Sequence, residues 1–281
     1  LVENAVTRLD EAGISDAAIE AAMLLGHLLD FSRAQLVLAA YDELGKETVR
    51  DFEEALLRRL GREPLAYIIG EQEFWSLPFT VTPDVLIPRP ETELLIETTL
   101  QEMKKEGTGL RGPVLDLGTG SGAIPIVLAL ELPDVMVYSL DQSFSALNVA
   151  SGNARFHNVQ DRVRFICSDW LQGISCKRIF SVVVTNPPYI AGSELAHLQP
   201  EVRGYEPVSA LDGGERGMEM IERIARQVPQ ALKRGGLFVM EIGADQEQYV
   251  LDLFGSIPEL ESLGVRKDYA GHPRIFLARR K

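Results

Sequence analysis

The sequence predicts an α/β protein in which a small helical bundle and a hairpin linker precede a mostly parallel sheet covered by helices. Three observations predict this fold. The first 70 residues show only helical periodicity, the next segment contains two strand-like runs interrupted by prolines, and strand-like and helix-like segments alternate after it. We therefore expect a helical domain over residues 1–70, a hairpin linker over 71–88 and a sheet domain over 89–281.

Short helices are predicted in the first domain, and their apolar faces can only be buried against one another. Capping residues predict where these helices begin and end. The expected helices are Val2–Ala12, then a run through Ala21, Leu24, Leu25 and Leu28 capped by Ser15 or Asp16, then Arg33–Ala40 capped by Ser32, and Lys46–Leu60 followed by Gly61 as the C′ residue.

Strands and helices alternate after the linker, in which Pro78 and Pro83 separate Phe74, Trp75, Phe79, Val81 and Val85. The expected strands are Val114–Leu117, Val135–Leu140, Val163–Cys167, Ile179–Thr185, Gly236–Glu241, Ser262–Lys267 and Arg274–Leu277. The expected helices are Glu91–Glu106, Ser121–Leu130, Ser143–His157, Gly217–Lys233 and Asp245–Phe254. Such alternation gives a parallel sheet with helices on both faces, which binds ligands at the carboxyl ends of its strands.

The composition excludes several classes of protein. Of the 281 residues, 46% are apolar and 25% are charged, which is close to the globular average and excludes a disordered or fibrous chain. The 28 basic and 41 acidic residues give a net charge of −13, which argues against a broad electrostatic grip on nucleic acid. The uncharged stretch Leu117–Leu130 is too short to span a bilayer.

The start of the chain and its cysteines bear on location. No basic segment followed by an apolar one opens the sequence, so no secretory signal is expected. The cysteines, Cys167 and Cys176, form no CxxC motif and are typical of thiols in a reducing compartment. We expect a cytoplasmic protein, although Leu1 in place of Met also fits trimming or the removal of an organelle address.

A glycine-rich loop, Gly118-Thr119-Gly120-Ser121-Gly122, follows the first strand of the sheet domain. Glycines admit positive φ and let a ligand approach the backbone, and free N–H groups at the next helix favour an acceptor group. The G-x-G-x-G spacing differs from the G-x-G-x-x-G of dinucleotide sites and lacks the G-K-[ST] of a P-loop. The loop predicts a nucleotide-like cofactor, with an ordinary tight turn as the alternative.

Two residues after later strands extend this prediction. Asp141 closes the next strand, where a carboxylate can accept both hydroxyls of a ribose. Trp170 follows the third strand within Ser168-Asp-Trp170, where an aromatic ring could receive an adenine. The structural alternatives are a helix N-cap for Asp141 and ordinary packing for Trp170.

The strand Ile179–Thr185 runs into the elbow Asn186-Pro187-Pro188-Tyr189. The prolines stiffen this turn and remove two N–H donors, which leaves the Asn186 side-chain oxygen and the Pro187 carbonyl as fixed acceptors. Two fixed acceptors suit a planar NH2 group, and Tyr189 could lie against its face. This arrangement predicts alkylation of a weakly nucleophilic amide or amine, aimed by orientation rather than by a strong base. A strand-ending turn without function is the alternative.

The motifs Asp116-Leu-Gly118-Thr-Gly120-Ser-Gly122 and Asn186-Pro-Pro-Tyr189 resemble those of S-adenosylmethionine-dependent amino-methyltransferases. The wider pattern resembles the HemK/PrmC family of N5-glutamine methyltransferases of peptide chain release factors. The further matching segments are Arg62-Glu-Pro-Leu-Ala-Tyr-Ile-Ile-Gly70, Phe79–Val81, Ile87-Pro-Arg-Pro-Glu-Thr-Glu93, Glu201-Val-Arg-Gly-Tyr-Glu-Pro207, Ala210-Leu-Asp-Gly-Gly214 and Glu241-Ile-Gly243. One departure is Arg216, where the resemblance leads us to expect an acidic residue.

The resemblance implies a Rossmann-like methyltransferase sheet and S-adenosyl-L-methionine as cofactor. It implies that Gly118–Gly122, Asp141, Trp170 and Asn186 hold this cofactor, and that Asn186–Tyr189 bind the glutamine amide, with Asn186, Pro187 and Tyr189 catalytic. The implied partner is a class-1 release factor, methylated in its Gly-Gly-Gln loop and docked with help from the helical domain. We expect a monomer without direct contact to nucleic acid or membrane.

Other functions fit the same elbow. An N-methyltransferase acting on adenine in DNA or guanine in RNA would use the same acceptors, although the chain lacks a basic domain. Methylation of a glutamine in a ribosomal protein is a closer rival, and a non-enzymatic cofactor-binding scaffold is a third. His27, His157, His197 and His272 show no ligand spacing, so no metal site is expected. Spacing does not decide whether Arg89 and Glu241 line the pocket.

Overall fold

The computed structural model divides the chain into two compact units, each of which is described by itself. Unit 1 comprises Leu1–Glu71 together with Gln199–Tyr205, and unit 2 comprises Gln72–Leu198 and Glu206–Lys281. The structure describes residues 1–39, 42–105, 110–172 and 178–281. The predicted helix ends at Ala40 and Glu106, together with Cys176, lie outside these residues. None of the described helices is long and apolar enough to cross a membrane.

Unit 1 is a bundle of short helices around a core of its own. The buried core side chains come mainly from α1, α2 and α4, among them Leu9, Leu24, Phe52 and Leu56. Since such short helices are marginal alone, this shared apolar core stabilises them. The helices are α1 (Val2–Glu11), α2 (Ala17–Leu29), α3 (Arg33–Leu38), α4 (Lys46–Leu60), α5 (Leu65–Ile69) and, from the later segment, α9 (Pro200–Tyr205).

The predicted caps of unit 1 have mixed outcomes. Ser32 caps α3 as expected, in a capping box with Gln35. Asp16 occupies the N-cap position of α2, but the predicted capping by its side chain is wrong, because this residue has φ 60° and its carboxylate accepts no hydrogen bond from the helix. The prediction for Gly61 is also wrong: its φ is −72°, and the next residue, Arg62, takes the left-handed conformation with φ 69°.

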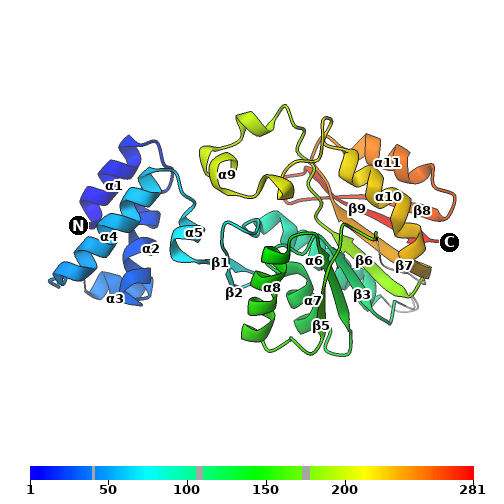
Figure 1. Cartoon of the computed structure of the whole chain (residues 1–281), viewed down its shortest axis with the longest axis horizontal. Helices are drawn as coiled ribbons and strands as arrows, with labels where there is room; N and C mark the ends of the chain where they lie inside the picture. Colours follow the sequence, from blue (N-terminus) through cyan, green and yellow to red (C-terminus); the bar gives the residue numbers. More distant parts are fainter. Residues whose placement is uncertain (40–41, 106–109, 173–177) are drawn as a thin grey trace. The chain divides into compact units, whose positions relative to one another are not determined.

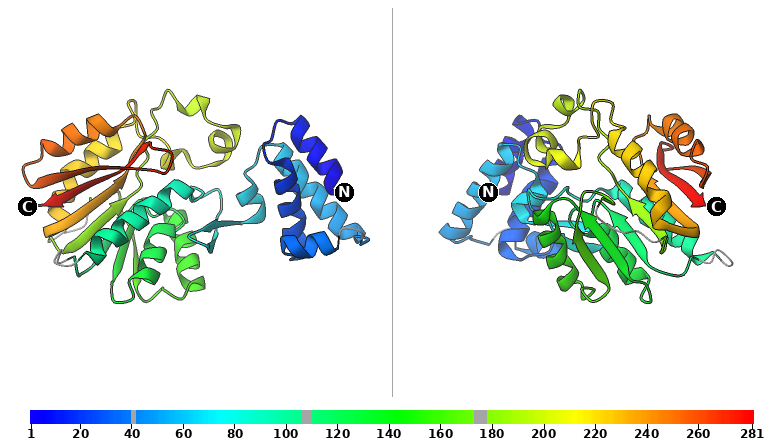
Figure 2. Two further views of the ribbon diagram at one scale, coloured as in Figure 1. Left: turned by 180° about the vertical axis from the view of Figure 1, so that it is seen from behind. Right: turned by 45° about the vertical axis from the view of Figure 1, so that its right-hand side comes forward.

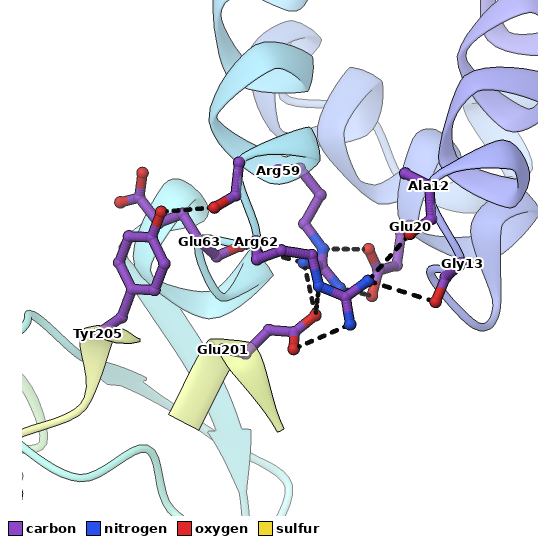
Figure 3. Close-up of polar contacts among 9 residues, drawn as sticks. Ala12, Gly13, Glu20, Arg59, Arg62, Glu63, Glu201 and Tyr205 are labelled. Atoms are coloured by element: carbon purple, nitrogen blue, oxygen red, sulfur yellow. Dashed lines mark hydrogen bonds and ion pairs between the residues drawn. The ribbon is translucent and has the colours of Figure 1, made fainter. Parts of the chain in front are cut away.

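Ion pairs of the buried Arg59 and the partly exposed Arg62 hold α9 in unit 1, and Figure 3 shows these arginines of α4 and its following turn converging on Glu201. Arg59 Nε lies 2.5 Å from Glu20 Oε2, and its Nη1 lies 3.0 Å from Glu201 Oε1. Arg62 Nε lies 3.1 Å from the same Glu201 oxygen. The hydroxyl of Tyr205 donates to the carbonyl of Gly61 at 2.7 Å. The sequence had not indicated a helix at α9 or its attachment to the bundle.

The described residues of unit 2 form a sheet of seven strands in the order β5-β4-β3-β6-β7-β9-β8, and Figure 1 labels all of these strands except β4. The first five strands of this order are parallel, β9 pairs antiparallel with β7, and β8 pairs antiparallel with β9. The predicted α/β sheet is therefore confirmed. The strands are β3 (Val114–Leu117), β4 (Val137–Asp141), β5 (Val163–Cys167), β6 (Phe180–Thr185), β7 (Leu232–Glu241), β8 (Leu260–Lys267) and β9 (Pro273–Arg280).

Helices cover both faces of this sheet, as Figure 2 shows from two further directions. Side chains alternate along the strands, so Val182 and Val184 pack with α6 and α7, while Val183 packs with α10 and α11. Both faces are thus buried, which accounts for the almost continuous apolar runs in the strands. The helices are η1 (Pro90–Thr92), α6 (Glu93–Lys104), α7 (Ala123–Glu131), α8 (Phe144–Phe156), η2 (Leu195–His197), η3 (Val208–Ala210), α10 (Glu219–Ala231) and α11 (Glu247–Gly255).

The predicted hairpin is present and precedes the sheet. It consists of β1 (Glu71–Phe74) and β2 (Leu77–Thr80), which form a two-stranded sheet. Both turn residues, Trp75 and Ser76, have φ 56°, and two such residues in a row are typical of tight hairpin turns whose twist matches the strands. Phe79 is buried and packs against His157 with ring centroids 4.9 Å apart. That histidine therefore has a packing role.

Candidate active site at the carboxyl edge of the sheet

The candidate site lies where the strand order reverses, between β3 and β6. Leu117 of β3 is in register with Leu140 of β4 and Thr185 of β6, and Thr185 is in register with Met240 of β7. The next residue of each strand or loop therefore falls in one row along the edge. That row consists of Asp141, Gly118, Asn186 and Glu241, in this order across the sheet. Parallel strands thus bring four separate sequence motifs to one edge.

A cavity of about 690 Å³, its open mouth included, lies over this row. Its lining residues come from the glycine loop, the ends of β4 and β5, the start of α8, the elbow and two loop segments. They are Asp84, Val85, Leu86, Gly118, Gly120, Leu140, Asp141, Gln142, Ser143, Ala146, Ser168, Asp169, Trp170, Asn186, Pro188, Pro207, Ser209 and Ala210.

The glycine loop meets the elbow and Trp170 at this cavity. All three glycines have positive φ, 80° at Gly118, 53° at Gly120 and 85° at Gly122, so any other residue would be strained there. A Cβ added to Gly118 would lie 3.8 Å from the Asn186 carbonyl oxygen and 3.9 Å from the Trp170 ring. A Cβ at Gly120 would meet nothing within 4 Å. The backbone of Gly120 is therefore open to a ligand.

Three of the five loop residues do not line the cavity, although the sequence predicted the whole loop as cofactor-binding. Gly122 packs against α8, where an added Cβ would lie 3.0 Å from Ala150. Ser121 is buried, and its carbonyl accepts a hydrogen bond from Asn153 at 2.9 Å. Thr119 is also buried and donates to Asp116 behind the loop. These residues shape the loop from inside.

Asp141 lines the cavity and also braces the glycine loop. Its Oδ2 accepts from the Gly120 N–H at 2.9 Å, and its Oδ1 accepts from the Ser143 N–H at 2.9 Å. Each carboxylate oxygen retains a further lone pair for a ligand hydroxyl. The predicted N-cap alternative does not hold, since Ser143 caps α8 by accepting from the Ala146 N–H.

A buried carboxyl group lies beneath the loop, and the sequence had not singled it out as an acid. Asp116 is fully buried, and its Oδ2 accepts from Ser139 at 2.6 Å and from Thr119. Burial raises the pKa of Asp116 to about 7, although these hydroxyl hydrogen bonds lower it. A partly neutral acid is thus held two residues before Gly118. The D-x-G spacing was the signal that could have found it.

The elbow presents its residues in different directions. Asn186 is half-buried and lines the cavity together with Pro188, whereas Pro187 and Tyr189 do not line it. The hydroxyl of Tyr189 lies 3.3 Å from Glu241 Oε1. Burial raises the pKa of Tyr189, and the nearby charge of Glu241 adds to this, so the phenol stays protonated.

A second glycine loop braces the elbow from behind. A Cβ at Gly217 would lie 2.5 Å from the Tyr189 carbonyl oxygen, and one at Gly213 would lie 2.8 Å from the Tyr189 Cα. Gln246 Nε2 donates to the Tyr189 carbonyl at 3.0 Å and to the Gly217 carbonyl at 3.1 Å. This contact gives the Gly213–Gly217 loop a role that the sequence left open. Arg216, the residue that departs from the expected pattern, is exposed and pairs with Glu222 at 2.7 Å.

An ion pair joins the two loop segments on the rim. Arg89 pairs with Glu206, whose other carboxylate oxygen accepts from the Ile87 N–H at 3.2 Å. Val85 and Leu86 precede this contact, and the lining segment that begins at Pro207 follows it. Arg89 thus fixes the rim and is absent from the lining of the cavity.

Asn186 is tied inward to buried groups of η1 and β7. Its Nδ2 donates to Thr92 Oγ1 at 3.1 Å, and Thr92 Oγ1 donates to Glu241 Oε2 at 2.7 Å. Among the described residues nothing hydrogen-bonds to Asn186 Oδ1. Burial raises the pKa of Glu241 to about 7, although the hydrogen bond from Thr92 and the charge of Arg274 lower it. The sequence had not decided whether Glu241 lines the pocket and had indicated no role for Thr92.

The arrangement fits a nucleoside-bearing methyl donor on chemical grounds. It combines an exposed glycine backbone, a carboxylate with free lone pairs and an aromatic ring around one cavity. Beside them stands an amide oxygen without a partner among the described residues, which can accept from a second molecule. Within the described part of the chain, no cluster of three or more His, Cys, Asp or Glu residues could hold a metal ion.

Comparison with known families agrees with both halves of the chain. Residues 1–70 match the family described as PrmC N-terminal domain. Residues 90–199 match the family described as Methyltransferase small domain.

Relatives of nearly the same length are similar to almost the whole chain. The release factor glutamine methyltransferase of Koribacter versatilis is 39% identical over 278 residues, which cover 99% of this chain and 96% of the relative. That of Cereibacter sphaeroides is 41% identical over 275 residues, which cover 98% of this chain and 95% of the relative.

Solved structures with the same fold are methyltransferases of low sequence identity. A ribosomal protein L11 methylase from Lactobacillus delbrueckii superposes with a TM-score of 0.51 at 16% identity, covering 72% of this chain and 84% of that one. A 16S rRNA methyltransferase of T. thermophilus in complex with AdoMet and guanosine gives 0.51 at 19% identity, covering 75% of this chain and 50% of that one. At such identities the likeness shows the fold alone.

Proposed function

The chain belongs to the family of release factor glutamine methyltransferases, and we propose that it methylates N5 of the glutamine in the Gly-Gly-Gln loop of class-1 peptide chain release factors. One observation carries the proposal. Gly118 and Asn186 stand side by side at the switch point of the sheet and line one cavity with Asp141 and Trp170. A donor molecule on the glycine side and an amide on the Asn186 side would therefore meet inside it.

The cofactor of the reaction is S-adenosyl-L-methionine, which supplies an electrophilic methyl group when bound. The residues that would hold it are those that line the cavity on the glycine side. Gly118 and Gly120 offer backbone that can be approached closely, Asp141 offers acceptor lone pairs for ribose hydroxyls, and Trp170 offers a ring for the adenine. Thr119, Ser121 and Gly122 would support this surface without touching the ligand.

The elbow would orient the amide. Asn186 Oδ1 is the acceptor proposed for one amide hydrogen of the substrate glutamine, and the rigid Pro187-Pro188 turn keeps it in place. The Pro187 carbonyl is the acceptor proposed for the second hydrogen, which requires the substrate amide to reach beyond the cavity lining, since Pro187 is not part of that lining. With both hydrogens held, the nitrogen lone pair is directed along one line. Orientation of this kind can contribute on the order of 7–11 kcal/mol to lowering a barrier. No strong base is needed, because the amide nitrogen becomes acidic as its new bond forms and then loses a proton.

For Tyr189 we propose a role that differs from the predicted contact with the amide face. Its hydroxyl faces Glu241 and its carbonyl is held by Gln246, so we propose that it anchors the elbow. Pro188, which lines the cavity, takes over the contact with the flat face of the amide. The rest of the partner prediction is proposed with the same reaction: a monomer in the cytoplasm, without direct contact to nucleic acid.

The test supplies labelled S-adenosylmethionine together with a class-1 release factor, its Gly-Gly-Ala loop variant, total ribosomal protein or duplex DNA. Label on the unmutated factor alone is the expected result. Label on the loop variant, on ribosomal protein or on DNA would overturn the substrate assignment. The net charge of −13 makes label on DNA the least expected of these outcomes.

A further inference from the structure

Asn186 stands at the open end of a line of hydrogen bonds that runs into the core of unit 2. The line passes from Asn186 Nδ2 to Thr92 Oγ1 over 3.1 Å, and from there to Glu241 Oε2 over 2.7 Å. Thr92 is 6% exposed and Glu241 2%, so bulk water does not compete for these bonds. The Tyr189 hydroxyl completes the group at Glu241 Oε1. The line joins η1, the end of β6 and the end of β7.

Counting protons gives this line a direction. A threonine hydroxyl has one proton to donate, and an ionised carboxylate has none. While Glu241 is ionised, Thr92 must therefore donate to Glu241, and its oxygen can only accept from Asn186. A side-chain amide carries its donor and its acceptor on opposite sides. With NH2 held inward, Oδ1 is left on the side of the cavity.

Resting on the proposed function, we infer that Thr92 and Glu241 are positioning residues that fix the amide of Asn186 with its oxygen toward the substrate. The opposite orientation would set the Asn186 NH2 against the NH2 of the incoming glutamine. Two donors cannot satisfy each other, and an unpaired polar group in a closed site costs about 1–3 kcal/mol. A flip of the Asn186 amide would therefore convert an elbow that binds the substrate amide into one that repels it.

Protonation of Glu241 would allow the hydrogen bonds between Glu241, Thr92 and Asn186 to reverse their donors and acceptors. The carboxyl group is faced by Tyr189 from the elbow, Arg274 from β9 and Glu91 from η1. Its pKa of about 7 means that a neutral carboxyl group, which can itself donate to Thr92, dominates below that pH. Thr92 could then donate to Asn186, whose oxygen would turn inward. Hence kcat/KM, which reports groups of the free enzyme, should rise as the pH rises through about 7.

The first arm of the test compares substitutions at Thr92 with a matched threonine. Thr92→Val keeps the shape and removes the hydroxyl, and Thr92→Ser restores it. Thr98→Val is the control, because Thr98 in α6 is also buried and its Oγ1 has no hydrogen-bond partner in the described structure. We expect Thr92→Val to lower kcat about 10–100-fold. Activity falls by a similar factor in metalloenzymes when a residue that orients a metal ligand by a hydrogen bond is removed. The Kd of S-adenosylmethionine should stay within a few-fold.

The second arm uses Glu241→Gln, which cannot ionise but can accept from Thr92 through its amide oxygen. We expect this variant to keep kcat within a few-fold of wild type at pH 8 and to lose the rise of kcat/KM around pH 7. A role in folding alone would leave the shape of the pH profile unchanged.

A readout without turnover separates this inference from the reaction assigned above. The side-chain NH2 resonances of Asn186, identified by their loss in Asn186→Asp, report its orientation directly. They should shift with pH around 7 in the wild type, not shift in Glu241→Gln, and lose exchange protection in Thr92→Val. If no release factor is methylated but the resonances behave so, the proposed function fails and the positioning role stands.

Two outcomes would overturn the positioning role. One is a Thr92→Val enzyme that turns over like Thr92→Ser and Thr98→Val. The other is a Thr92→Val enzyme whose cofactor affinity and unfolding midpoint fall along with kcat while the Asn186 resonances stay as in wild type.

Discussion

Each unit of the molecule buries a charged side chain, but the two surroundings differ. In unit 1, Arg59 is 5% exposed and meets two carboxylates, Glu20 and Glu201. In unit 2, Glu241 is 2% exposed and forms no ion pair among the described residues, only hydrogen bonds from hydroxyl groups. The charge of Arg59 is therefore balanced by adjacent carboxylates, whereas the charge of Glu241 is stabilised by uncharged hydrogen-bond donors.

The pKa shifts follow from this difference. Burial opposes the charge of Arg59, yet Glu20 and Glu201 outweigh it and the pKa of Arg59 is raised. At Glu241 burial dominates, and its pKa rises to about 7. The guanidinium of Arg59 therefore stays charged around neutral pH, where its ion pairs hold structure. A carboxyl group that titrates near neutrality can change the state of its neighbours.

Breaking the ion pairs of unit 1 should give the largest effect, and the effect should be on stability. Removing one partner of a buried pair leaves an uncompensated charge, which costs about 3–5 kcal/mol. We therefore expect Arg59→Ala to lower the free energy of unfolding of the full chain by this amount in denaturant titrations followed by circular dichroism. The affinity of the folded protein for S-adenosylmethionine should be unchanged, because the cavity lies in unit 2.

A matched control comes from the same helix. Arg50 of α4 pairs with Asp51 at 2.7 Å, but its side chain is 62% exposed. Solvent screens such a pair, so Arg50→Ala should not change the unfolding midpoint measurably. Equal losses in Arg50→Ala and Arg59→Ala would mean that burial is not what distinguishes the two ion pairs.

The acceptor at the cavity should show the converse pattern. Asn186→Ala should lower methyl transfer roughly 10²-fold or more, because a preorganised polar contact to the reacting group is lost. Its unfolding equilibrium constant and its Kd for S-adenosylmethionine should each stay within a few-fold of the wild-type value. Single-turnover rates with labelled cofactor measure the first quantity and calorimetry the last. Near-normal turnover would remove Asn186 from the reaction.

The same contrast explains what the sequence could predict. Gly118 and Asn186 directly follow apolar strands and Asp141 ends one. Because the ends of parallel strands meet at one edge, local pattern was enough to bring them together. The pair Arg59–Glu201 joins residues 142 apart, and Thr92–Glu241 joins residues 149 apart. No periodicity along the chain encodes such pairs, because they depend on how finished elements pack.

Side-chain direction was the second limit. Tyr189 shares a tetrapeptide with Asn186, yet its hydroxyl faces Glu241 and not the cavity. Likewise, Thr119 and Ser121 alternate with cavity-lining glycines but are buried. A motif gives the position of a residue on the backbone, whereas the side that it presents follows from φ and ψ and from its neighbours. Helix α9 was missed because six residues carry too few periods to be recognised.

The smallest of these effects should come from Asp141, which serves both structure and ligand. Its carboxylate already accepts from the Gly120 and Ser143 N–H groups, so part of its role persists without a cofactor. Asp141→Ala removes these bonds as well as the proposed ribose contact. We expect it to weaken S-adenosylmethionine about tenfold or more in calorimetry, since a hydrogen bond to a charged group contributes about 1.5–3 kcal/mol.

Two further substitutions separate the two roles of Asp141. Asp141→Asn keeps one acceptor oxygen and should lose less affinity than Asp141→Ala. Asp134→Ala is the matched control, because Asp134 is exposed and lies before β4, at the opposite end of the strand from the cavity. The Asp134→Ala variant should bind S-adenosylmethionine with the affinity of wild type. Unchanged binding in Asp141→Ala would contradict the ribose assignment and leave Asp141 as a brace of the glycine loop, in the same class as Arg59.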